Sequence, residues 1–279
     1  MASKRAVVTS ISPGLVRTIR GNDGAGPEYQ ALCIRSWLTA GFDVLSLNCD
    51  SELDVLRPLH PEVEFVRARR TGLDQWGAPL VYVVDLVDCL HERGYEVGGI
   101  VNADVFTTRD REYFDRLIGL CASGGAAYGQ RVDVSDLADG AEAAFYAHGY
   151  DYFFFEVAAA RSIVPTEHLL GMVWWDLWFP MALRWSGLAL NRMFSPTVFH
   201  LKHPERTGGR FDTLWRHFYR HTVDCVGRQL ALGGDPLLEE LFAPSRGFRH
   251  AENWQEEAVA FGEMANQYLE RTAQPQAFR

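Results

Sequence analysis

Short runs of β-branched and apolar residues alternate with stretches of helical spacing through the first half of the chain. The runs predict strands over residues 6–11, 42–48, 63–68 and 97–108. The stretches between and after them predict helices over residues 28–41, 79–94 and 109–125. Strands that alternate with helices build a parallel sheet, because each helical crossover returns the chain to the same end of the sheet. The pattern predicts an α/β fold with an open, mostly parallel sheet and helices on both faces.

The pattern changes after residue 125. Residues 126–134 and 150–160 are predicted to be further strands of the same sheet, and 196–203 a short strand. The Trp-rich segment 169–190 is predicted to be a helix packed against the core, because Asp176, Pro180 and Arg184 interrupt it too often for a membrane span.

The C-terminal part is predicted to be helical from about Phe211. Within residues 254–270 the apolar side chains share one helix face, formed by Trp254, Ala258, Phe261, Ala265 and Tyr268. This face is expected to pack on its own domain; the alternative is a homodimer formed through it. We therefore expect one domain over residues 1–203 and a helical extension over residues 204–279.

Composition narrows the class of protein. The 279 residues include 27 Lys and Arg against 36 Asp and Glu, for a net charge of −9. Nucleic-acid binding requires a basic surface, so this balance argues against it. The five cysteines are scattered and never spaced as CxxC, which favours reduced thiols and the cytoplasm over a disulfide framework or a zinc ribbon.

The segment IVNADVF (100–106) is the most informative for chemistry. An apolar strand leads into Asn102 and Asp104, and ligands of open α/β sheets bind at the carboxyl ends of strands. Alternate residues of an extended strand share a face, so both side chains are expected together, where they could hold a divalent cation and a ribose hydroxyl. The alternative is a strand-end acid that caps the following turn.

Two other loops follow strands of the same edge. After the second strand, Asn48, Asp50 and Glu52 are candidates for contact with a nucleoside, although Asp50 could instead begin a helix. After the first strand, Ser10 and a Gly-rich turn precede Arg17, which could contact phosphate. This turn contains neither a Walker motif nor GxGxxG.

Two later segments carry further candidates. In WWDLWF (174–179), Asp176 stands among apolar residues, as expected of a general base or of a buried acid paired with Arg184. Its neighbours Trp174, Trp175 and Trp178 could stack on a sugar or belong to the core.

HLKH (200–203) offers two histidines. Because a strand precedes them, we expect one to reach a site, His203 rather than His200, as a metal ligand or diphosphate contact. Lys202 is the second candidate contact for phosphate. The alternative is a structural histidine at a turn.

The order of these parts resembles the nucleotide-sugar glycosyltransferases of the GT-A fold. The strand AVVTSI, the NCDSE cluster, Asn-Ala-Asp at 102–104, Asp176 in WWDLW and His203 in HLKHPER follow in the family's order. The segment 36–52 also resembles bacterial glycosyltransferase-like proteins. The resemblance covers about residues 5–206, and it departs from the family where Asn102 replaces the first acid of the DxD motif.

The resemblance implies transfer of a sugar from a nucleoside diphosphate to the hydroxyl of a glycan or lipid-linked acceptor, in bacterial surface glycan synthesis. Asp104 and His203 would hold Mn²⁺ or Mg²⁺ on the diphosphate, and Asp176 would deprotonate the acceptor if the reaction inverts. Trp174, Trp175 and Trp178 would contact the acceptor. A cytoplasmic enzyme, free or peripheral at the inner membrane face, is expected.

Two alternatives remain open. A sugar-nucleotide nucleotidyltransferase would carry a Gly-rich loop with an Arg/Lys signature after the first strand, which SPGLVRTIRG matches poorly. A non-catalytic relative that binds sugar nucleotides or glycans is favoured by Asn102.

Overall fold

The computed structural model describes residues 4–19, 21–22, 24–122, 124–138, 141–147, 149–203, 211–248 and 254–278. Its main sheet has eight strands in the order β12-β10-β6-β9-β4-β1-β2-β3. These strands are β1 (Arg5–Thr9), β2 (Asp43–Asn48), β3 (Glu64–Arg67), β4 (Val97–Val101), β6 (Gly125–Gly129), β9 (Tyr152–Glu156), β10 (Ala189–Met193) and β12 (Gln274–Gln276). All neighbours pair in parallel except β9, which is antiparallel to both β4 and β6. The mostly parallel α/β sheet predicted from the sequence is confirmed.

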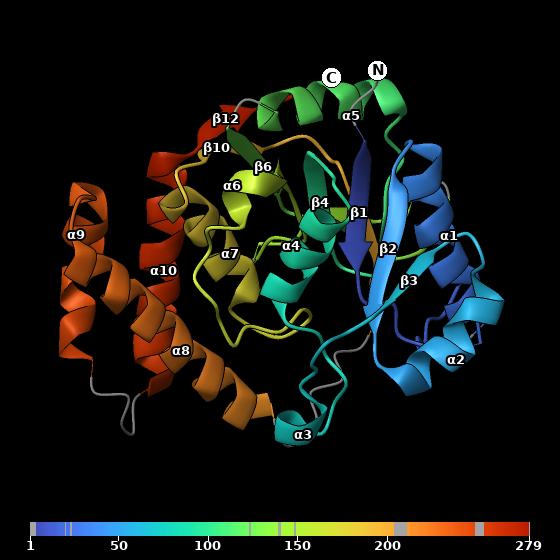
Figure 1. Cartoon of the computed structure of the whole chain (residues 1–279), viewed down its shortest axis with the longest axis horizontal. Coiled ribbons are helices and arrows are strands. Elements are labelled where there is room, and N and C mark those ends of the chain that lie inside the picture. The colour runs from blue at the N-terminus through green and yellow to red at the C-terminus, as the bar shows by residue number, and fades with distance from the viewer. Residues whose placement is uncertain are drawn as a thin grey trace.

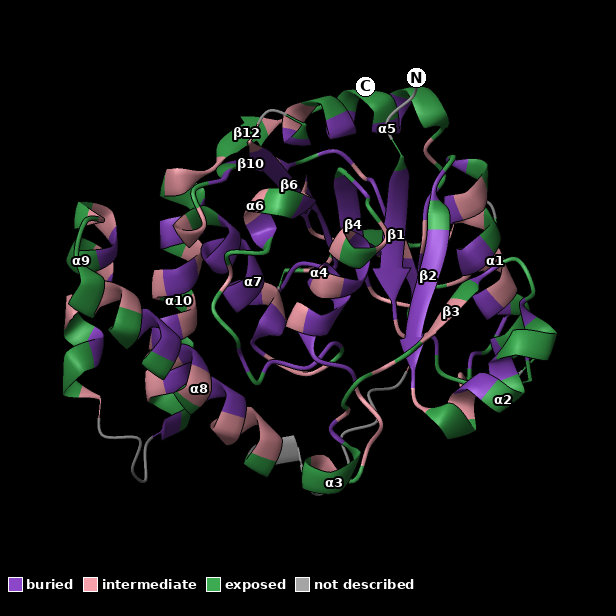
Figure 2. Ribbon diagram, in the orientation of Figure 1, coloured by how far each residue is buried: buried purple, intermediate pink, exposed green. Residues whose placement is uncertain are grey.

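Alternating side chains of the central strand divide the core into two layers. Val7 of β1 packs into the layer that contains Trp37 of α1 (Gly26–Thr39) and Phe114 of α5 (Arg111–Cys121). Its neighbours Ala6 and Val8 face the opposite layer, which contains residues of α4 (Val83–Glu92) and α7 (Trp175–Trp185). Helices therefore cover both faces, and Figure 2 shows the central strands buried between them.

The remaining N-terminal helices follow β2 and β3 along the chain. They are α2 (Asp50–Leu59), between β2 and β3, and the short α3 (Leu73–Trp76). Gly77 ends α3 with a φ of 68°, a left-handed conformation that glycine adopts without steric cost.

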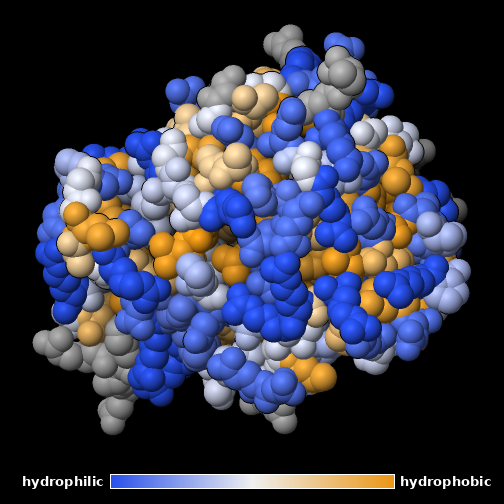
Figure 3. All heavy atoms as spheres, in the orientation of Figure 1, coloured by the Kyte–Doolittle hydropathy of each residue, from blue (hydrophilic) through white to orange (hydrophobic). Residues whose placement is uncertain are grey.

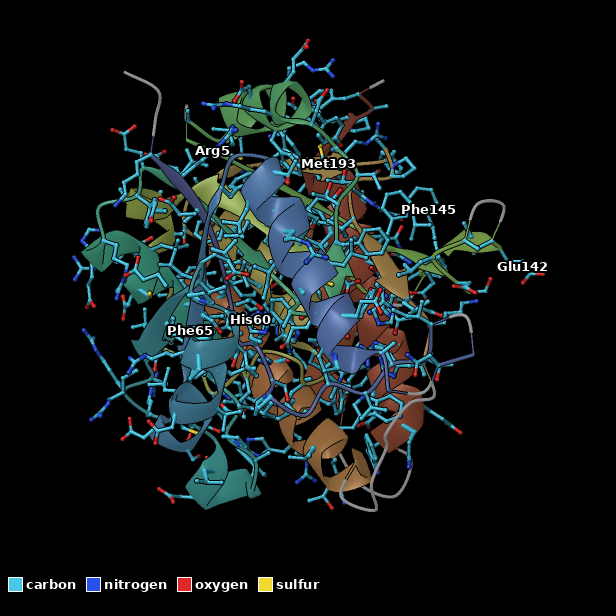
Figure 4. All side chains as sticks on the ribbon, turned by 90° about the vertical axis from the view of Figure 1, so that its right-hand side faces the viewer. Arg5, His60, Phe65, Glu142, Phe145 and Met193 are labelled. Carbon is cyan, nitrogen blue, oxygen red and sulfur yellow. The ribbon has the colours of Figure 1, made fainter. Side chains whose placement is uncertain are left out.

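A second sheet extends beyond β4 and has the order β5-β11-β7-β8. Its strands are short: β5 (Val105–Phe106), β7 (Val132–Val134), β8 (Ala143–Phe145) and β11 (Phe199–Leu201). Figure 4 shows Glu142 and Phe145 at its projecting outer end.

This second sheet corrects three predicted elements. The strand expected over 97–108 is divided by a turn into β4 and β5, and the strand over 126–134 is divided between the two sheets. The strand over 196–203 shortens to β11 and also joins the second sheet. The sequence does not predict a second sheet, because pairing partners distant in sequence leave no local signal.

The segment 169–190 is also divided. α7 occupies Trp175–Trp185, and the chain then turns into β10, which the sequence analysis missed together with β8 and β12. The short helix α6 (Val157–Ala160) takes the end of the strand expected over 150–160.

The C-terminal part contains α8 (Phe211–Leu232), α9 (Pro236–Phe242), the 3-10 helix η1 (Ala243–Gly247) and α10 (Trp254–Thr272). These helices gather on one side of the molecule, away from β3 (Figure 1). The predicted apolar face of α10 is buried within the chain, with Phe261 and Tyr268 inaccessible to solvent. This face is not available to a second copy, so a homodimer remains a prediction without an assigned surface.

The chain returns to the main sheet after α10, where β12 pairs in parallel with β10. The last residues therefore complete a sheet edge, whereas a purely helical extension was expected. Among the described residues no helix has the length and apolar character needed to cross a membrane. The face shown in Figure 3 is mostly hydrophilic, with small apolar areas between the polar groups.

Candidate active site

The turn after β4 carries the acidic motif. Asn102, Ala103 and Asp104 leave the strand and connect it to β5, so they do not share a strand face as predicted. Asn102 Nδ2 donates a hydrogen bond to Asp151 Oδ1 at 2.7 Å. Asn102 therefore fixes the turn, whereas the carboxylate of Asp104 is available for other contacts.

Three side chains converge on one oxygen of Asp104. The atoms Arg17 Nη2, His200 Nε2 and His203 Nε2 lie 2.5, 3.3 and 3.9 Å from Asp104 Oδ2. Asp104, His200 and His203 each offer one ligand atom, and these atoms all lie within 4.8 Å of one another. We call these three residues the cavity cluster.

Strand register explains why His200 belongs to this cluster. In β11, His200 is paired with Val105 of β5 on one side and with Asp133 of β7 on the other. Its ring therefore lies between two carboxylates, with His200 Nδ1 at 2.9 Å from Asp133 Oδ1 and Nε2 facing Asp104. The structure places both histidines here, and His200, which the sequence analysis set aside, is the closer one.

The cluster is electrostatically coupled. Burial alone would raise the pKa of Asp104, but the hydrogen bond from His200 and the positive charges of His200 and Arg17 hold it well below its usual range. Burial also opposes charge on His200, yet hydrogen bonds to Asp104 and Asp133 raise its pKa above the ordinary value. A divalent cation at this point therefore competes with the His200 proton and with Arg17 for the Asp104 carboxylate.

The cluster opens into a cavity of about 450 Å³, a size suited to a small organic ligand. Ser10 and Glu52 line one wall, and Leu170 and Gly171 from the loop before α7 line another. Asn48 lies behind the first wall, where its Nδ2 donates to Ile11 O at 2.8 Å and to Glu52 Oε2 at 2.9 Å. Asn48 therefore positions the wall and Glu52 faces the cavity.

Four predicted contacts do not line this cavity: Arg17 and Asn48, which bond to the lining residues Asp104 and Glu52, and Asp50 and Lys202, which do not. Asp50 is 63% exposed and pairs with Arg67 at 2.8 Å, as the helix-start alternative for Asp50 allows. Lys202 is exposed, and its backbone N–H donates to Val134 O at 2.9 Å. Neither side chain is brought to Asp104.

Asp176 occupies the first turn of α7. Burial and the neighbouring charge of Asp151 raise its pKa to about 7. Its Oδ2 lies against the backbone of Gly149, where a Cβ atom would be 1.9 Å away. Asp151 also accepts a hydrogen bond from Arg131, which lines the cavity, so Asp176 lies one charged residue behind the cavity wall.

The tryptophans before and after Asp176 belong to the core. Trp174, Trp175 and Trp178 are at most 7% exposed, so they do not form the predicted acceptor surface. Trp174 has a φ of 75°, a strained conformation for a bulky residue, and its ring packs on Tyr219 and Phe261. These contacts hold the backbone at the point where α7 begins.

Sequence analysis missed Arg131, Asp133 and Asp151. Arg131 Nε donates to Asp133 Oδ1 at 2.7 Å, and its Nη1 donates to Asp151 Oδ1 at 2.8 Å. One signal was present, because charged residues at 131 and 133 alternate with valines in a segment predicted to be a strand of the sheet. The pairing of that segment with β11 gives these charges their role, and this pairing was not predicted.

The sheet and the acidic turn at the end of β4 together define a GT-A-like fold. Comparison with solved structures supports this assignment. A mannosyltransferase from Pyrobaculum calidifontis, solved with GDP-Man and Mn²⁺, matches with a TM-score of 0.52 and 11% identity, over 97% of this chain and 76% of that one. No model of a known protein family and no curated protein matches the chain.

Two further matching structures have lower TM-scores. TarS of S. aureus, residues 1–349 with UDP-GlcNAc, matches with a TM-score of 0.47 and 10% identity, over 79% of this chain and 66% of that one. The bifunctional IspDF of Campylobacter jejuni matches with a TM-score of 0.39 and 11% identity, over 68% of this chain and 49% of that one. This chain therefore spans about half the length of IspDF. At such identities the likeness shows the fold alone, and the predicted GT-A-like fold is confirmed.

Proposed function

We propose that the chain transfers a sugar from a nucleoside diphosphate donor to an acceptor hydroxyl. The observation that carries the proposal is the cavity cluster, an ionised carboxylate with two imidazoles at the wall of a ligand-sized cavity. The fold agrees with the proposal, since the Pyrobaculum calidifontis mannosyltransferase of similar fold was solved with GDP-Man and Mn²⁺.

The cavity cluster fits a divalent cation. Carboxylate and imidazole ligands suit Mn²⁺ better than Mg²⁺, which prefers oxygen and octahedral geometry. Asp133 holds the second ring nitrogen of His200, the arrangement usual around metal-binding histidines. When bound, the cation would offset negative charge on the diphosphate as the sugar leaves.

The chain's own residues would position the donor. Arg17 is 5% exposed and does not line the cavity, but its guanidinium pairs with Asp104, so it would place a positive charge beside a diphosphate held there. Ser10 and Glu52 would face the nucleoside from the opposite wall, with Asn48 supporting Glu52 from behind.

Asp176 would act on the acceptor from beside the cavity, since its partly exposed side chain does not belong to the cavity lining. An acid with a pKa near 7 can take a proton from a hydroxyl at neutral pH, and its place in the first turn of α7 fixes its direction. Because the three tryptophans are core residues, the acceptor would contact the loop that contributes Leu170 and Gly171. A glycan or lipid-linked acceptor, and a role in bacterial surface glycan synthesis, belong to this proposal.

One observation favours a second candidate, binding of a sugar nucleotide without transfer. Arg17 pairs with the oxygen of Asp104 that a cation would need. A protein of this kind would bind the nucleotide through Arg17 and would not require a metal.

A turnover assay separates the two functions. The full-length protein is incubated with a panel of UDP- and GDP-sugars, with and without Mn²⁺, and release of the nucleoside diphosphate is measured. An enzyme gives Mn²⁺-stimulated release that Asp104→Asn removes and that Asp54→Asn, a change of an exposed acid on α2, retains. Calorimetric binding without release in any condition would instead establish the binding protein.

A further inference from the structure

A second group of possible metal ligands lies far from Asp104 in the sequence. His168 belongs to the loop before α7, and His221 and Cys225 lie one turn apart on α8. A ring nitrogen of each histidine and the cysteine sulfur all lie within 4.8 Å of one another. We call these three residues the buried cluster, because His168 is inaccessible to solvent and Cys225 is 6% exposed.

Hydrogen bonds define which nitrogen of His168 carries a proton. The hydroxyl of Thr222 donates its one proton to Phe218 O at 2.8 Å. Thr222 Oγ1 therefore accepts from His168 Nε2, 3.3 Å away, so Nε2 is protonated and Nδ1 has the lone pair. His168 Nδ1 is buried and has no hydrogen-bond partner among the described residues. A buried acceptor without a partner is costly, and a bound cation would satisfy it.

The distance between His221 and Cys225 also suits a metal. His221 Nε2 lies 3.7 Å from Cys225 Sγ. Ligands of a tetrahedral zinc ion at the usual bond lengths of about 2.3 Å to sulfur and 2.0 Å to nitrogen lie about 3.5 Å apart. His221 Nε2 accepts the hydroxyl of Thr166 at 2.8 Å and the backbone N–H of Glu167 at 3.1 Å, so it too presents a lone pair. Metal binding would replace both of these hydrogen bonds.

The surroundings of the Cys225 sulfur also favour metal binding. Arg228 Nη2 donates to Cys225 Sγ at 3.0 Å, which places a positive charge beside the atom that becomes a thiolate on metal binding. Cys225 also lines a cavity of about 470 Å³ between α7 and α8, which offers a path for an ion to enter. The described chain thus supplies two neutral imidazoles, one thiol and an entry route.

We propose that His168, His221 and Cys225 bind a zinc ion, with water in the fourth position. Nitrogen and sulfur ligands in this number are typical of zinc and unsuited to the hard cations expected at Asp104. The ion would tie α8 to the loop before α7. That loop continues into Leu170 and Gly171, which line the cavity of the candidate active site, so zinc would stabilise one of its walls.

Cobalt substitution tests the proposal, because Co²⁺ takes zinc sites and reports its ligands by absorption. The full-length protein is freed of metal with a chelator and titrated with Co²⁺. A sulfur-to-cobalt charge-transfer band and the visible bands of tetrahedral cobalt are expected at one equivalent. Cys225→Ser should lose the charge-transfer band.

Two variants serve as controls. Cys89→Ser changes another buried cysteine that contacts an arginine, Arg93 Nη1 at 3.5 Å, but has no place in a ligand cluster of the described residues. Asp104→Asn removes a ligand of the cavity cluster. Both should keep the charge-transfer band, and its absence from the wild type or its survival in Cys225→Ser would overturn the proposal.

X-ray absorption at the zinc edge of the wild-type protein needs no variant, in case Cys225→Ser does not fold. One sulfur at about 2.3 Å with nitrogen neighbours at about 2.0 Å is expected. A shell of nitrogen and oxygen alone would refute the site.

Discussion

The cavity cluster and the buried cluster contain nearly the same ligands in opposite surroundings. Each has two histidines and one group that can become an anion, Asp104 in the first and Cys225 in the second. The cavity cluster lies among charged side chains at the wall of an open cavity, and Asp104 is 25% exposed. The buried cluster lies among aromatic rings: the ring of His168 is stacked on Phe218 and tilted against Trp178.

The surroundings decide the charge of the imidazoles. Hydrogen bonds to Asp104 and Asp133 raise the pKa of His200 against the effect of burial. Burial, together with the nearby His221 and His217, lowers the pKa of His168 well below its ordinary value. Similar residues are therefore poised differently: the cavity cluster must exchange a proton for a cation, whereas the imidazoles of the buried cluster are already neutral.

His200→Gln is expected to have the largest effect. It removes a proposed metal ligand and leaves two carboxylates without their shared partner, so Mn²⁺-stimulated turnover should fall on the order of a hundredfold or more. The measurement is turnover against Mn²⁺ concentration, with the cobalt–thiolate absorption recorded in parallel. The thiolate band should remain, and its loss would show that the two clusters are not independent.

Substitutions of the residues that hydrogen-bond to the proposed metal ligands are expected to have the next largest effect, on metal affinity. Asp133→Asn weakens the partner of His200 and should reduce Mn²⁺ affinity about 10- to 100-fold. Thr222→Val removes the corresponding partner of His168, but that partner is an uncharged hydroxyl at 3.3 Å, so Zn²⁺ affinity should fall by less than about tenfold. Competition with a coloured chelator measures both affinities, and the reverse order would contradict the electrostatic contrast.

Gly149→Ala is expected to displace the carboxylate of Asp176, the proposed base of the candidate active site. The new Cβ would lie 1.9 Å from Asp176 Oδ2, so the carboxylate must rotate away while the donor site stays intact. We expect about a tenfold lower kcat with an unchanged KM for the donor, since proton transfer depends on position. Gly119→Ala is the matched control, because nothing lies within 4 Å of its added Cβ. Equal effects of the two substitutions would remove Asp176 from the mechanism.

Local signals predicted much of the fold. The apolar runs at β1, β2 and β4 and the helical spacing of α1 and α5 recovered the central sheet, because buried parallel strands are nearly continuous hydrophobic segments. Asn102 and Asp104 were expected at the carboxyl end of the strand β4 but on the strand itself, whereas the structure places them in the turn between β4 and β5. The antiparallel β9 was not foreseen, since strand direction depends on the path of the connection and leaves no mark in composition.

The sequence predicted only the part of the candidate site that lies at the end of a single strand. The cavity cluster joins β4 to β11, whose three-residue length gives too weak a pattern to show which histidine faces inward. The buried cluster joins a loop to a helix 50 residues later, and neither segment predicts the other. Asp176 stays a candidate, singled out because an acid among tryptophans is unusual. The burial of those tryptophans depends on packing with α8 and α10, which the local sequence does not show.

The smallest expected effect is the pH dependence of stability in an Asp176 variant. It tests whether burial determines the protonation state of Asp176, as it does for His168 in the buried cluster. The pKa of Asp176 is about 7, against 3.8 for an unperturbed carboxyl, so between these values the folded state binds more protons than the unfolded state. Stability of the wild type therefore falls as pH rises toward 7 and beyond it this contribution is constant. Asp176→Asn cannot ionise, so its free energy of unfolding relative to wild type should increase by about 1 kcal/mol from pH 6 to pH 8. Urea unfolding at the two pH values measures this difference, with Asp54→Asn as the control for an exposed acid. A pH-independent difference would mean that Asp176 is solvated, and its role as a base at neutral pH would then lose its physical cause.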